Sequence, residues 1–434
     1  MKLIHPKSIN IFILLILLLF IFSGCGKNNY NSNTRTTLVQ DINTINKDTI
    51  SVSSLNLYGK QIYNLVDIVS REEVSSQEYS NQEVIKTKDL EESVPSVSLL
   101  MVGDNLVHEQ VIASGKKDDG SYNFDHLFEI LKEDIEAADI AIINQETILG
   151  GDLFSYSGYP NFNTPVEMGD SIHKTGFDVV LHATNHTMDK GYKAVANTIE
   201  YWREYPDITV LGINETKEHR DTIPTVTKNG ITIAMLNYTY SLNGYKLPKD
   251  KPYLVNMLDE EQVIKDIRNA KEIADFVIVF PHWGTEYVYE PDDYQKKWTS
   301  LFLTEEVDLV VGTHPHVLQP IEWITSTTGH KMLIYYSLGN YVSYQKEAPR
   351  MLGGMANITL IKEDNKVFIK DSGIIPIVTH YENRDNYHYG VYKLENYTLE
   401  QSLVHGVLEL QKSSSFSFSG TIELAKNVLK DWYN

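Results

Sequence analysis

Runs of consecutive apolar residues alternate with amphipathic stretches along the chain from residue 97 onward. The apolar runs have the length of strands buried on both faces, and they lie at 97–102, 140–143, 179–181, 231–236, 276–280, 309–311 and 332–336. Between many of these runs, apolar residues recur with helical spacing, as at 124–137, 260–274 and 294–306. Strands that alternate with helices in this way predict an α/β fold whose sheet is covered by helices.

The N-terminal residues have a different pattern, which is typical of a secretory signal peptide over residues 1–24. Two lysines precede an apolar stretch over residues 9–22, which is shorter than the roughly 20 residues that a membrane-spanning helix needs. Two small residues then lead into Cys25, as in a bacterial lipobox, with Phe22 where lipoboxes usually carry Leu. The resemblance implies a lipid on Cys25. An uncleaved signal anchor is the alternative interpretation.

Residues 25–94 are rich in Asn, Ser, Thr, Lys and Glu and lack the spacing that buries a core. We interpret them as a flexible tether that holds a folded domain away from the membrane. The folded domain is then expected over residues 95–382, and residues 383–434 are expected to form a partly helical C-terminal extension. This organisation predicts a lipid-anchored protein at the extracytoplasmic face of a bacterial cell membrane.

The net charge limits the partners that the chain can bind. The 434 residues carry a formal charge of -20, which excludes a nucleic-acid partner because phosphate contacts need clustered Lys and Arg. An acidic protein that handles an anionic substrate needs a local source of positive charge, which a bound cation supplies. Solubility alone is the other interpretation of this acidity. A single cysteine allows no intramolecular disulfide, so the core must stabilise the fold.

Polar residues that suit catalysis or metal binding follow the apolar runs. They are Asp104, Glu146, Asn185, His186, His282, His314 and His316. Each lies within a few residues of the carboxyl end of a predicted strand, and the ligands of open α/β folds bind at that edge of the sheet. We therefore expect these side chains to converge on one crevice.

Taken singly, these residues have ordinary structural explanations. Asp104 can cap a turn or helix, Glu146 can be a surface acid, and His282 can be a core histidine. The pair His314 and His316 is more specific, because residues i and i+2 of an extended segment face the same side. Together the histidines, the carboxylates and the amide form a nitrogen and oxygen ligand set that suits Zn, Mn or Fe better than Ca or Mg.

Several short motifs resemble, in their order along the chain, those of the CapA family of poly-γ-glutamate capsule synthesis proteins. They are Gly103-Asp104, Asn144-Gln145-Glu146, Thr184-Asn185-His186, His282-Trp283-Gly284-Thr285-Glu286-Tyr287, Gly312-Thr313-His314-Pro315-His316 and Ser337-Leu338-Gly339-Asn340-Tyr341, and they cover about residues 97–380. The resemblance implies a metallophosphoesterase-like fold, a four-layer α/β/β/α sandwich with its metal site at the carboxyl ends of the strands. It also implies a divalent metal cofactor, as two ions of Mn, Fe or Zn.

Carried onto this chain, the resemblance implies roles for individual residues. Glu146 stands where a carboxylate bridges the two metals, and His186 matches the histidine that donates a proton to a leaving oxygen. Two metals held close together could orient a hydroxide and stabilise charge on a phosphoryl or acyl oxygen. The implied metal ligands are Asp104, Glu146, Asn185, His282, His314 and His316.

Four neighbours of these residues are expected to support the site. Trp283 and Tyr287 are expected to form its walls. Glu286 and Asp189 are expected to orient the histidines from behind. For Asp189, capping of the helix that follows is the alternative interpretation.

The chain departs from the related patterns at two positions that bear on the chemistry. Phosphoesterases usually carry a histidine two residues after the first aspartate, where this chain has Leu106, and His108 is the nearest substitute. Glu109 stands where many family members carry an arginine. The loss of that arginine weakens the case for a bidentate grip on a phosphate or carboxylate.

Two functions follow from these patterns. The first is a metal-dependent hydrolase or transferase that acts on a cell-envelope substrate, with His186 as its general acid. The second is a component of a polymer synthesis or export complex, in which the metal crevice binds poly-γ-glutamate or a similar anionic polymer. In that interpretation the lipid places the protein beside the synthase and export subunits. The fold alone does not decide between them.

Overall fold

The computed structural model describes residues 94–384, 387–410 and 416–433. The expected signal peptide, Cys25 and the tether lie outside the described residues. No helix in the described ranges is long and apolar enough to cross a membrane.

The larger of two sheets has eight strands and is parallel on one side and antiparallel on the other. Its order is β14-β13-β12-β1-β2-β3-β4, and β11 also pairs with β1. The pairs among β1, β2, β3 and β4 are parallel, whereas β12 pairs antiparallel with both β1 and β13. The strands are β1 (Ser96–Asn105), β2 (Ile140–Gln145), β3 (Val179–Leu181), β4 (Thr209–Leu211), β11 (Asn340–Val342), β12 (Leu352–Glu363), β13 (Lys366–Glu382) and β14 (His388–Lys393).

The second sheet has six strands in the order β5-β6-β7-β8-β10-β9. Its central pairs, β6 with β7, β7 with β8 and β8 with β10, are parallel. The strands are β5 (Thr225–Lys228), β6 (Ile231–Thr239), β7 (Phe276–His282), β8 (Leu309–Val311), β9 (Ile321–Thr325) and β10 (Lys331–Tyr335). Each of the apolar runs identified from the sequence therefore corresponds to a strand, and only the run 332–336 extends past its strand, by one residue.

Side chains that alternate along the strands of the second sheet separate two cores. On β7, Phe276 and Ile278 pack into the core that the two sheets share, whereas Val277 and Val279 pack against the helices on the opposite face. Those helices are α9 (Glu260–Ile273) and α10 (Asp293–Thr304).

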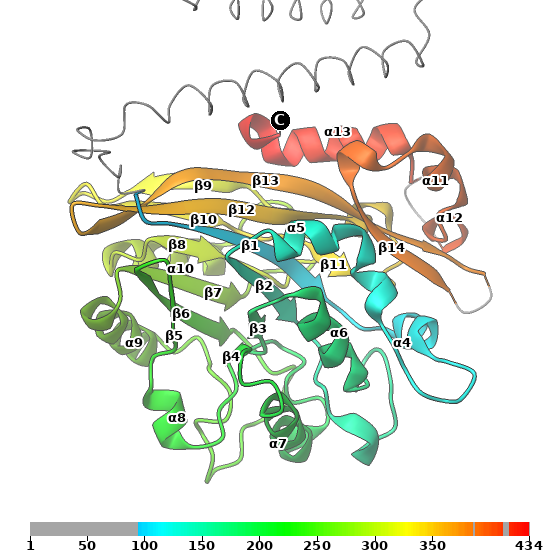
Figure 1. Ribbon diagram of the computed structural model, residues 1–434, viewed down its shortest axis with the longest axis horizontal. Helices are drawn as coiled ribbons and strands as arrows, with labels where there is room; N and C mark the ends of the chain where they lie inside the picture. The colour runs from blue at the N-terminus through cyan, green and yellow to red at the C-terminus, as the bar shows by residue number, and fades with distance from the viewer. Residues whose placement is uncertain (1–93, 385–386, 411–415, 434) are drawn as a thin grey trace, which may run out of the picture. The chain divides into compact units, whose positions relative to one another are not determined.

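Helices also cover the outer face of the larger sheet (Figure 1), among them α5 (Lys132–Glu136) and α6 (Glu167–Thr175). The layers run helix, sheet, sheet, helix. The predicted four-layer α/β/β/α sandwich is thus confirmed, with two stacked sheets.

The remaining helices are short and mostly connect the strands. They are α4 (Glu109–Gly115), α7 (Gly191–Trp202), α8 (Lys217–Asp221), α11 (Leu399–Val404), α12 (Val407–Leu410) and α13 (Phe418–Leu429), with single turns η1 (Asp125–Leu127), η2 (Glu129–Leu131), η3 (Gly151–Leu153), η4 (Ala348–Met351), η5 (Leu394–Asn396) and η6 (Lys430–Trp432). The helix predicted over 124–137 is divided among η1, η2 and α5. Phe124, Leu127, Phe128, Leu131 and Ile135, which carry the helical spacing, are all buried, so contacts with the core satisfy the pattern without one continuous helix.

The C-terminal residues belong to the same sandwich. The boundary expected at residue 382 lies between two paired strands, since β14 continues the larger sheet beyond β13. Part of the extension is helical, as α13 and η6 show, and Trp432 of η6 contacts the ring of Tyr335 with the centroids 6.2 Å apart.

Four aspartates stand immediately before parallel strands and accept a backbone N–H from the neighbouring strand. The pairs are Asp139 with Ser98 (2.9 Å), Asp178 with Ala141 (2.7 Å), Asp275 with Thr232 (2.9 Å) and Asp308 with Val277 (2.8 Å). Each carboxylate thus pairs a backbone donor at the amino end of a strand. These contacts fix the starts of the strands, and hence the level at which their carboxyl ends meet.

Candidate metal centre

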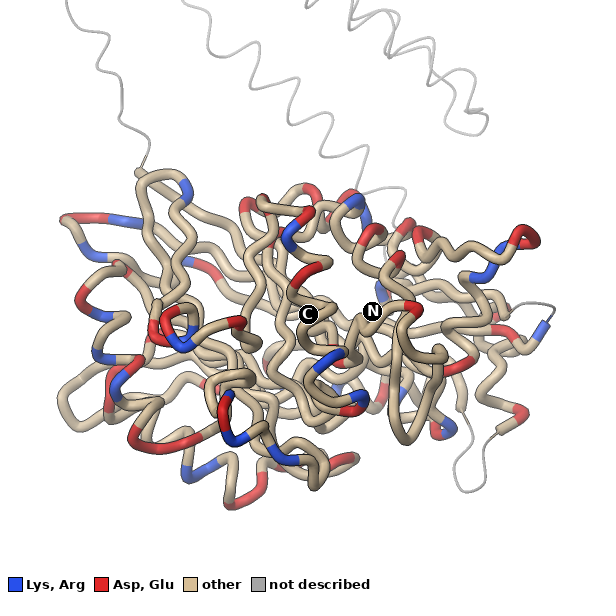
Figure 2. The backbone as a smooth tube through the Cα atoms, turned by 90° about the horizontal axis from the view of Figure 1, so that it is seen from below, with Lys and Arg blue, Asp and Glu red and all other residues tan. Residues whose placement is uncertain are grey.

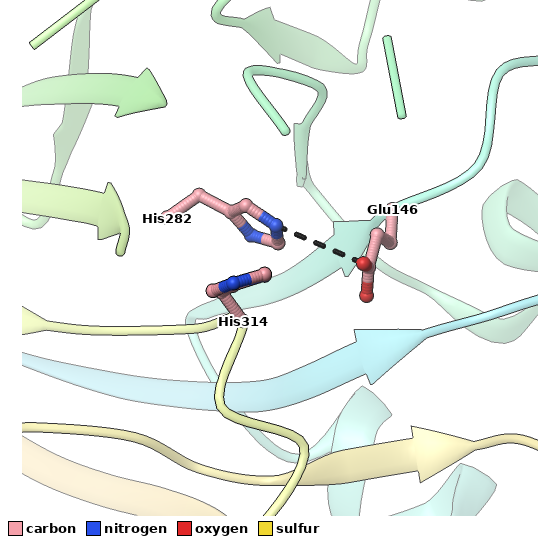
Figure 3. Close-up of side chains that lie close together, drawn as sticks. All are labelled: Glu146, His282 and His314. Atoms are coloured by element: carbon pink, nitrogen blue, oxygen red, sulfur yellow. Dashed lines mark ion pairs between the residues drawn. The ribbon is translucent and has the colours of Figure 1, made fainter. Parts of the chain in front are cut away.

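The candidate site lies where strands of both sheets end. Asp104 is near the end of β1 and Glu146 directly follows β2, whereas His282 is the last residue of β7. Figure 3 shows Glu146, His282 and His314 turned toward one another from these separate segments, with His282 Nε2 3.7 Å from Glu146 Oε1. The predicted convergence at the carboxyl ends of the strands is present in the fold.

Three groups of ligand-type side chains meet at this place. The groups are Glu146, His282 and His314; Glu286, His314 and His316; and Asp104, Glu146 and His316. Within each group the ligand atoms lie within 4.8 Å of one another. Glu146, His314 and His316 each belong to two groups, so the groups form one continuous cluster.

The loop after β8 presents its two histidines in a way that the sequence did not indicate. His314 and His316 both have positive φ angles, 98° and 58°, so the segment is not extended and the predicted reason for their common direction is wrong. Their imidazoles nevertheless lie close together, with centroids 5.7 Å apart. Non-glycine residues rarely adopt this left-handed backbone, which costs about 1–3 kcal/mol each and clusters at functional sites.

Close backbone contacts hold β1 against the chain that leads into β11. Asp104 N donates to Gly339 O at 2.9 Å. A Cβ at Gly103 would lie 2.0 Å from the same carbonyl oxygen, so no larger residue fits there without a shift of the backbone. Asp104 is placed by this contact as well as by its strand.

Asp104 and Glu146 are both buried but differ in their hydrogen bonds. Asp104 accepts from Asn144 Nδ2 at 2.8 Å and from His316 Nδ1 at 3.0 Å. Neither carboxyl oxygen of Glu146 has a hydrogen-bond partner in the described part of the chain. Burial raises the pKa of Glu146 well above its ordinary value. A buried carboxyl group without partners is costly unless something pairs with it.

The three imidazoles differ in charge. Burial, with the neighbouring imidazoles, holds the pKa of His282 and of His314 well below the ordinary value, so both rings are neutral and can donate a lone pair. Burial also lowers the pKa of His316, but the adjacent carboxyl groups of Glu146 and Asp104 outweigh it and raise the pKa to about 9. His314 Nδ1 has no hydrogen-bond partner within the described residues.

These observations fit a divalent metal. The cluster combines imidazole nitrogens with carboxylate oxygens, the donor set that suits Zn, Mn and Fe. The unpaired atoms of Glu146 and His314 are the ones that a bound cation would pair. The described residues are therefore compatible with a divalent metal site.

Asn185 and His186 follow β3 and reach the same cluster. Asn185 Oδ1 lies 2.9 Å from His282 Nε2. His186 Nδ1 lies 2.8 Å from Asp189 Oδ2, which also accepts the backbone N–H of Phe162 at 2.8 Å. The N-cap of α7 is Lys190, without a side-chain cap. Asp189 therefore does not cap α7. Its carboxylate holds the His186 ring instead.

The residues after His282 divide between the core and the site. Trp283 was expected to wall the site, but it is fully buried in the core beneath α10 and donates to Tyr336 O at 3.0 Å. Tyr287 does lie at the site, with its ring 6.0 Å from that of His316. Glu286 was expected to orient a histidine from behind, yet its carboxylate stands within ligand distance of His314 and His316.

A pocket of about 640 Å³ opens beside the cluster, and His186, Glu286, Tyr287 and His316 line it. His108 also lines it, and Tyr344 N donates to His108 Nδ1 at 3.2 Å. His108 belongs to none of the three ligand groups found among the described residues, so the geometry does not favour it as the substitute for a histidine at Leu106.

Three further residues at the site carried no role in the sequence-based prediction. Asn340 Oδ1 lies 3.0 Å from His316 Nδ1, and Lys346 and Arg350 line the pocket. Asn340 lies in a motif that suggested family resemblance, but only the pairing of β11 with β1, which sets it opposite Asp104, reveals its position.

Comparison with known proteins gives a family and several relatives. Residues 98–345 match the family described as bacterial capsule synthesis protein PGA_cap. The chain is 37% identical over 168 residues to PGA biosynthesis protein CapA of Bacillus subtilis (strain 168), a match that covers 38% of this chain and 42% of that protein. It is 28% identical over 255 residues to capsule biosynthesis protein CapA of Bacillus anthracis, covering 57% of this chain and 59% of that protein. The matches thus span about half the length of these relatives.

Solved structures resemble the chain distantly. A 5'-nucleotidase precursor from Thermus thermophilus matches with a TM-score of 0.41 and 13% identity, over 77% of this chain and 58% of that one. The calcineurin-like phosphoesterase YfkN from Bacillus subtilis matches with a TM-score of 0.39 and 13% identity, over 77% of this chain and 98% of that one.

Proposed function

The chain belongs to the PGA_cap family of bacterial capsule synthesis proteins, and from this membership we propose that it acts in the synthesis or export of poly-γ-glutamate or a similar anionic polymer. It does so at the extracytoplasmic face of the membrane, through its metal centre. The signal-peptide pattern and the lipobox-like sequence before Cys25 support the location and a lipid anchor. The names of the two Bacillus relatives support the role in capsule formation.

The observation that carries the metal-dependent part is the cluster of three overlapping ligand groups, at whose centre Glu146 has no hydrogen bond to either carboxyl oxygen within the described residues. Asp104, Glu146, His282, His314 and His316 would hold a divalent metal, with Asn185 and Glu286 beside them. When bound, such a metal supplies Lewis-acid chemistry that stabilises negative charge on a substrate oxygen.

The partners in this proposal follow from the location. The lipid on Cys25 and the tether would keep the domain near the membrane, where a polymer synthase and export subunits work. The polymer would enter the pocket beside the metal centre.

A metal-dependent hydrolase of a cell-envelope substrate is the second candidate, and the His186–Asp189 contact favours it. Asp189 accepts the Nδ1–H of His186, which leaves Nε2 as the nitrogen free to exchange a proton. Because His186 lines the pocket, Nε2 is available to protonate a leaving oxygen of a substrate held there. Asp189 acts by holding the tautomer and the orientation of the ring.

The test measures metal content and turnover on the full-length protein in detergent. We expect near-stoichiometric Mn, Fe or Zn by plasma mass spectrometry. Turnover is assayed on phosphomonoester, phosphodiester and γ-glutamyl substrates, with His186→Ala as the variant. His219→Ala, an exposed histidine on α8, is the matched control.

The outcomes separate the two candidates. Turnover that disappears in His186→Ala, while metal content and the His219→Ala control are unchanged, would establish the hydrolase and its bond class. Bound metal without turnover would favour polymer binding and assembly. Absence of metal under every loading condition would refute both metal-dependent proposals.

A further inference from the structure

A segment far along the chain brings positive charge to the pocket beside the metal centre. Residues 343–350 follow β11 and include the first turn of η4, and Lys346 and Arg350 of this segment line the pocket. Glu109 lines the same pocket. Acidic and basic residues are interspersed over the described chain (Figure 2), and the pocket is mixed as well, because Glu286 and Glu347 line it together with the two cations.

Hydrogen bonds fix this segment relative to a predicted metal ligand. Asn340 Oδ1 lies 3.0 Å from His316 Nδ1, and Asn340 Nδ2 donates to Arg350 O at 3.0 Å. Tyr381 Oη donates to Gln345 O at 3.0 Å from the neighbouring β13. Through Asn340, the backbone of Arg350 is held at a set position beside His316.

The side chain of Arg350 is ordered by stacking. Its guanidinium carbon lies 3.4 Å from the centroid of the Tyr287 ring, which in turn lies 6.0 Å from the His316 ring. A guanidinium that stacks on an aromatic ring keeps its N–H donors free at its edge. Contacts thus run from Arg350 through the Tyr287 ring to His316, whose ring is tilted against that of Tyr287.

The donors of Arg350 are largely uncommitted. Its side chain is only 17% exposed, and its one ion pair among the described residues is to Glu347, at 3.4 Å. A guanidinium has five N–H donors, so one long contact leaves most of them for a ligand. Lys346, on the same wall of the pocket, makes no ion pair within the described ranges.

We infer that Arg350, assisted by Lys346, binds a carboxylate of the substrate beside the metal centre, so that the site takes an oligomer with repeated carboxylates. This inference rests on the proposed function, because it assigns the pocket to the polymer. A planar guanidinium fork matches a carboxylate through two parallel hydrogen bonds. A γ-linked glutamate chain carries one free carboxylate on every unit.

The arrangement favours an oligomer over a small anion. The ligand groups of the metal centre can hold one oxygen-bearing group, whereas Arg350 packs on Tyr287, whose ring lies next to that of His316. A second anionic group at a fixed distance along the same molecule would engage Arg350. The pocket volume of about 640 Å³ leaves room for more than one unit.

The test is the affinity of the full-length, Mn-loaded protein in detergent for a γ-linked glutamate decamer, measured by calorimetry. Arg350→Gln is expected to weaken binding about tenfold to a hundredfold, because it removes a charge-assisted contact. Arg350→Lys keeps the charge but loses the planar fork of donors, so its affinity is expected to lie between those of the parent and of Arg350→Gln. The matched control is Arg268→Gln, which changes an exposed arginine of α9 that pairs with Glu305. The affinity of this variant is expected to stay within about twofold of that of the parent.

The metal and affinity measurements test this inference separately from the proposed function. Equal metal content in Arg350→Gln and the parent shows that the metal centre is intact. Parent protein that binds the decamer equally well after Arg350→Gln would overturn the role of Arg350 and leave the proposed function standing. Parent protein that does not bind the decamer, or that binds a glycerol phosphate oligomer in its place, would overturn the carboxylate substrate and with it the polymer assigned to the pocket.

Discussion

Glu146 places a carboxyl group in the interior with neither oxygen hydrogen-bonded in the described chain, whereas Asp104 beside it accepts hydrogen bonds from Asn144 and His316. The two acids are neighbours in one cluster, yet the metal-free protein would lose different amounts of stability if each were replaced. Glu146 is therefore expected to serve mainly a bound ligand, whereas Asp104 also stabilises the fold.

We predict that Glu146→Gln abolishes the stabilisation that Mn or Zn confers, about 2.7 kcal/mol when the metal is at a hundred times its Kd, but changes metal-free stability by less than about 1 kcal/mol. Asp104→Asn is expected to lose the metal response and also about 1–3 kcal/mol of metal-free stability, because a charged acceptor is lost. Thermal unfolding with and without metal measures both quantities. A full metal response in Glu146→Gln would show that the cluster is not the binding site.

The limits of the sequence are also visible at single residues. Asp104, Glu146, His282, His314 and His316 could be found because each follows an apolar run, and the carboxyl ends of such runs share one edge. Trp283 was misplaced although the period of two predicts its side: it follows His282 directly, so its side chain points to the opposite face and into the helix-side core.

Arg350 and Asn340 could not have been found in this way. Arg350 sits in a single helical turn with no apolar run before it, and it reaches the pocket only because β11 pairs with β1 and the following chain turns back. Likewise, nothing in the residues His314 and His316 indicates their left-handed backbone. The sequence reveals which residues end strands, but contacts between distant segments decide which of them meet.

At the scale of the elements, the aspartates before the parallel strands fix the register at which these strands begin to pair. Each pairs a backbone donor of the neighbouring strand, but their surroundings differ. Burial raises the pKa of Asp308 from an ordinary 3.8 to about 6. Burial opposes the shift of Asp275, but the hydrogen bonds from Lys362 and from the backbone of Thr232, together with the charge of Lys362, outweigh it and lower the pKa.

These opposite shifts predict opposite dependences of stability on pH. The folded protein binds more protons than the unfolded chain at Asp308, so the contribution of Asp308 is present below pH 4 and is lost as the pH rises through about 6, at a cost of about 3 kcal/mol. The contribution of Asp275 is present at neutral pH and is lost as the pH falls through its lowered pKa.

Urea unfolding of Asp308→Asn and Asp275→Asn at several pH values measures this difference. Relative to the parent, Asp308→Asn is expected to gain stability between pH 4 and pH 7, whereas Asp275→Asn is expected to lose it as the pH rises from the acid range. Variants that shift in the same direction would contradict the assignment.

At the scale of the whole molecule, the candidate metal centre spans the two sheets. Asp104 and Glu146 come from strands of the larger sheet, whereas His282 and the two loop histidines come from the second sheet. A metal held by both sets links the sheets at their carboxyl edge. Elsewhere the sheets are held by the apolar core that they share.

Removal of the metal is therefore expected to loosen both sheets together at that edge. Amide hydrogen exchange should speed up near the carboxyl ends of β1 and β2 and, to a similar extent, of β7 and β8, while the pairing of β13 with β14 stays protected. Exchange that changes on one sheet alone would indicate that the ion does not link them.

The contact between Asp104 and His316 joins residues that are 212 positions apart. Such distant contacts form late in folding, because closing a long loop costs entropy before the contact is gained. The cluster is complete only when both sheets have formed and docked, so a bound ion would join a nearly finished protein and would not nucleate its folding. Which metal fills the candidate centre would consequently be decided by the ions of the compartment in which folding ends.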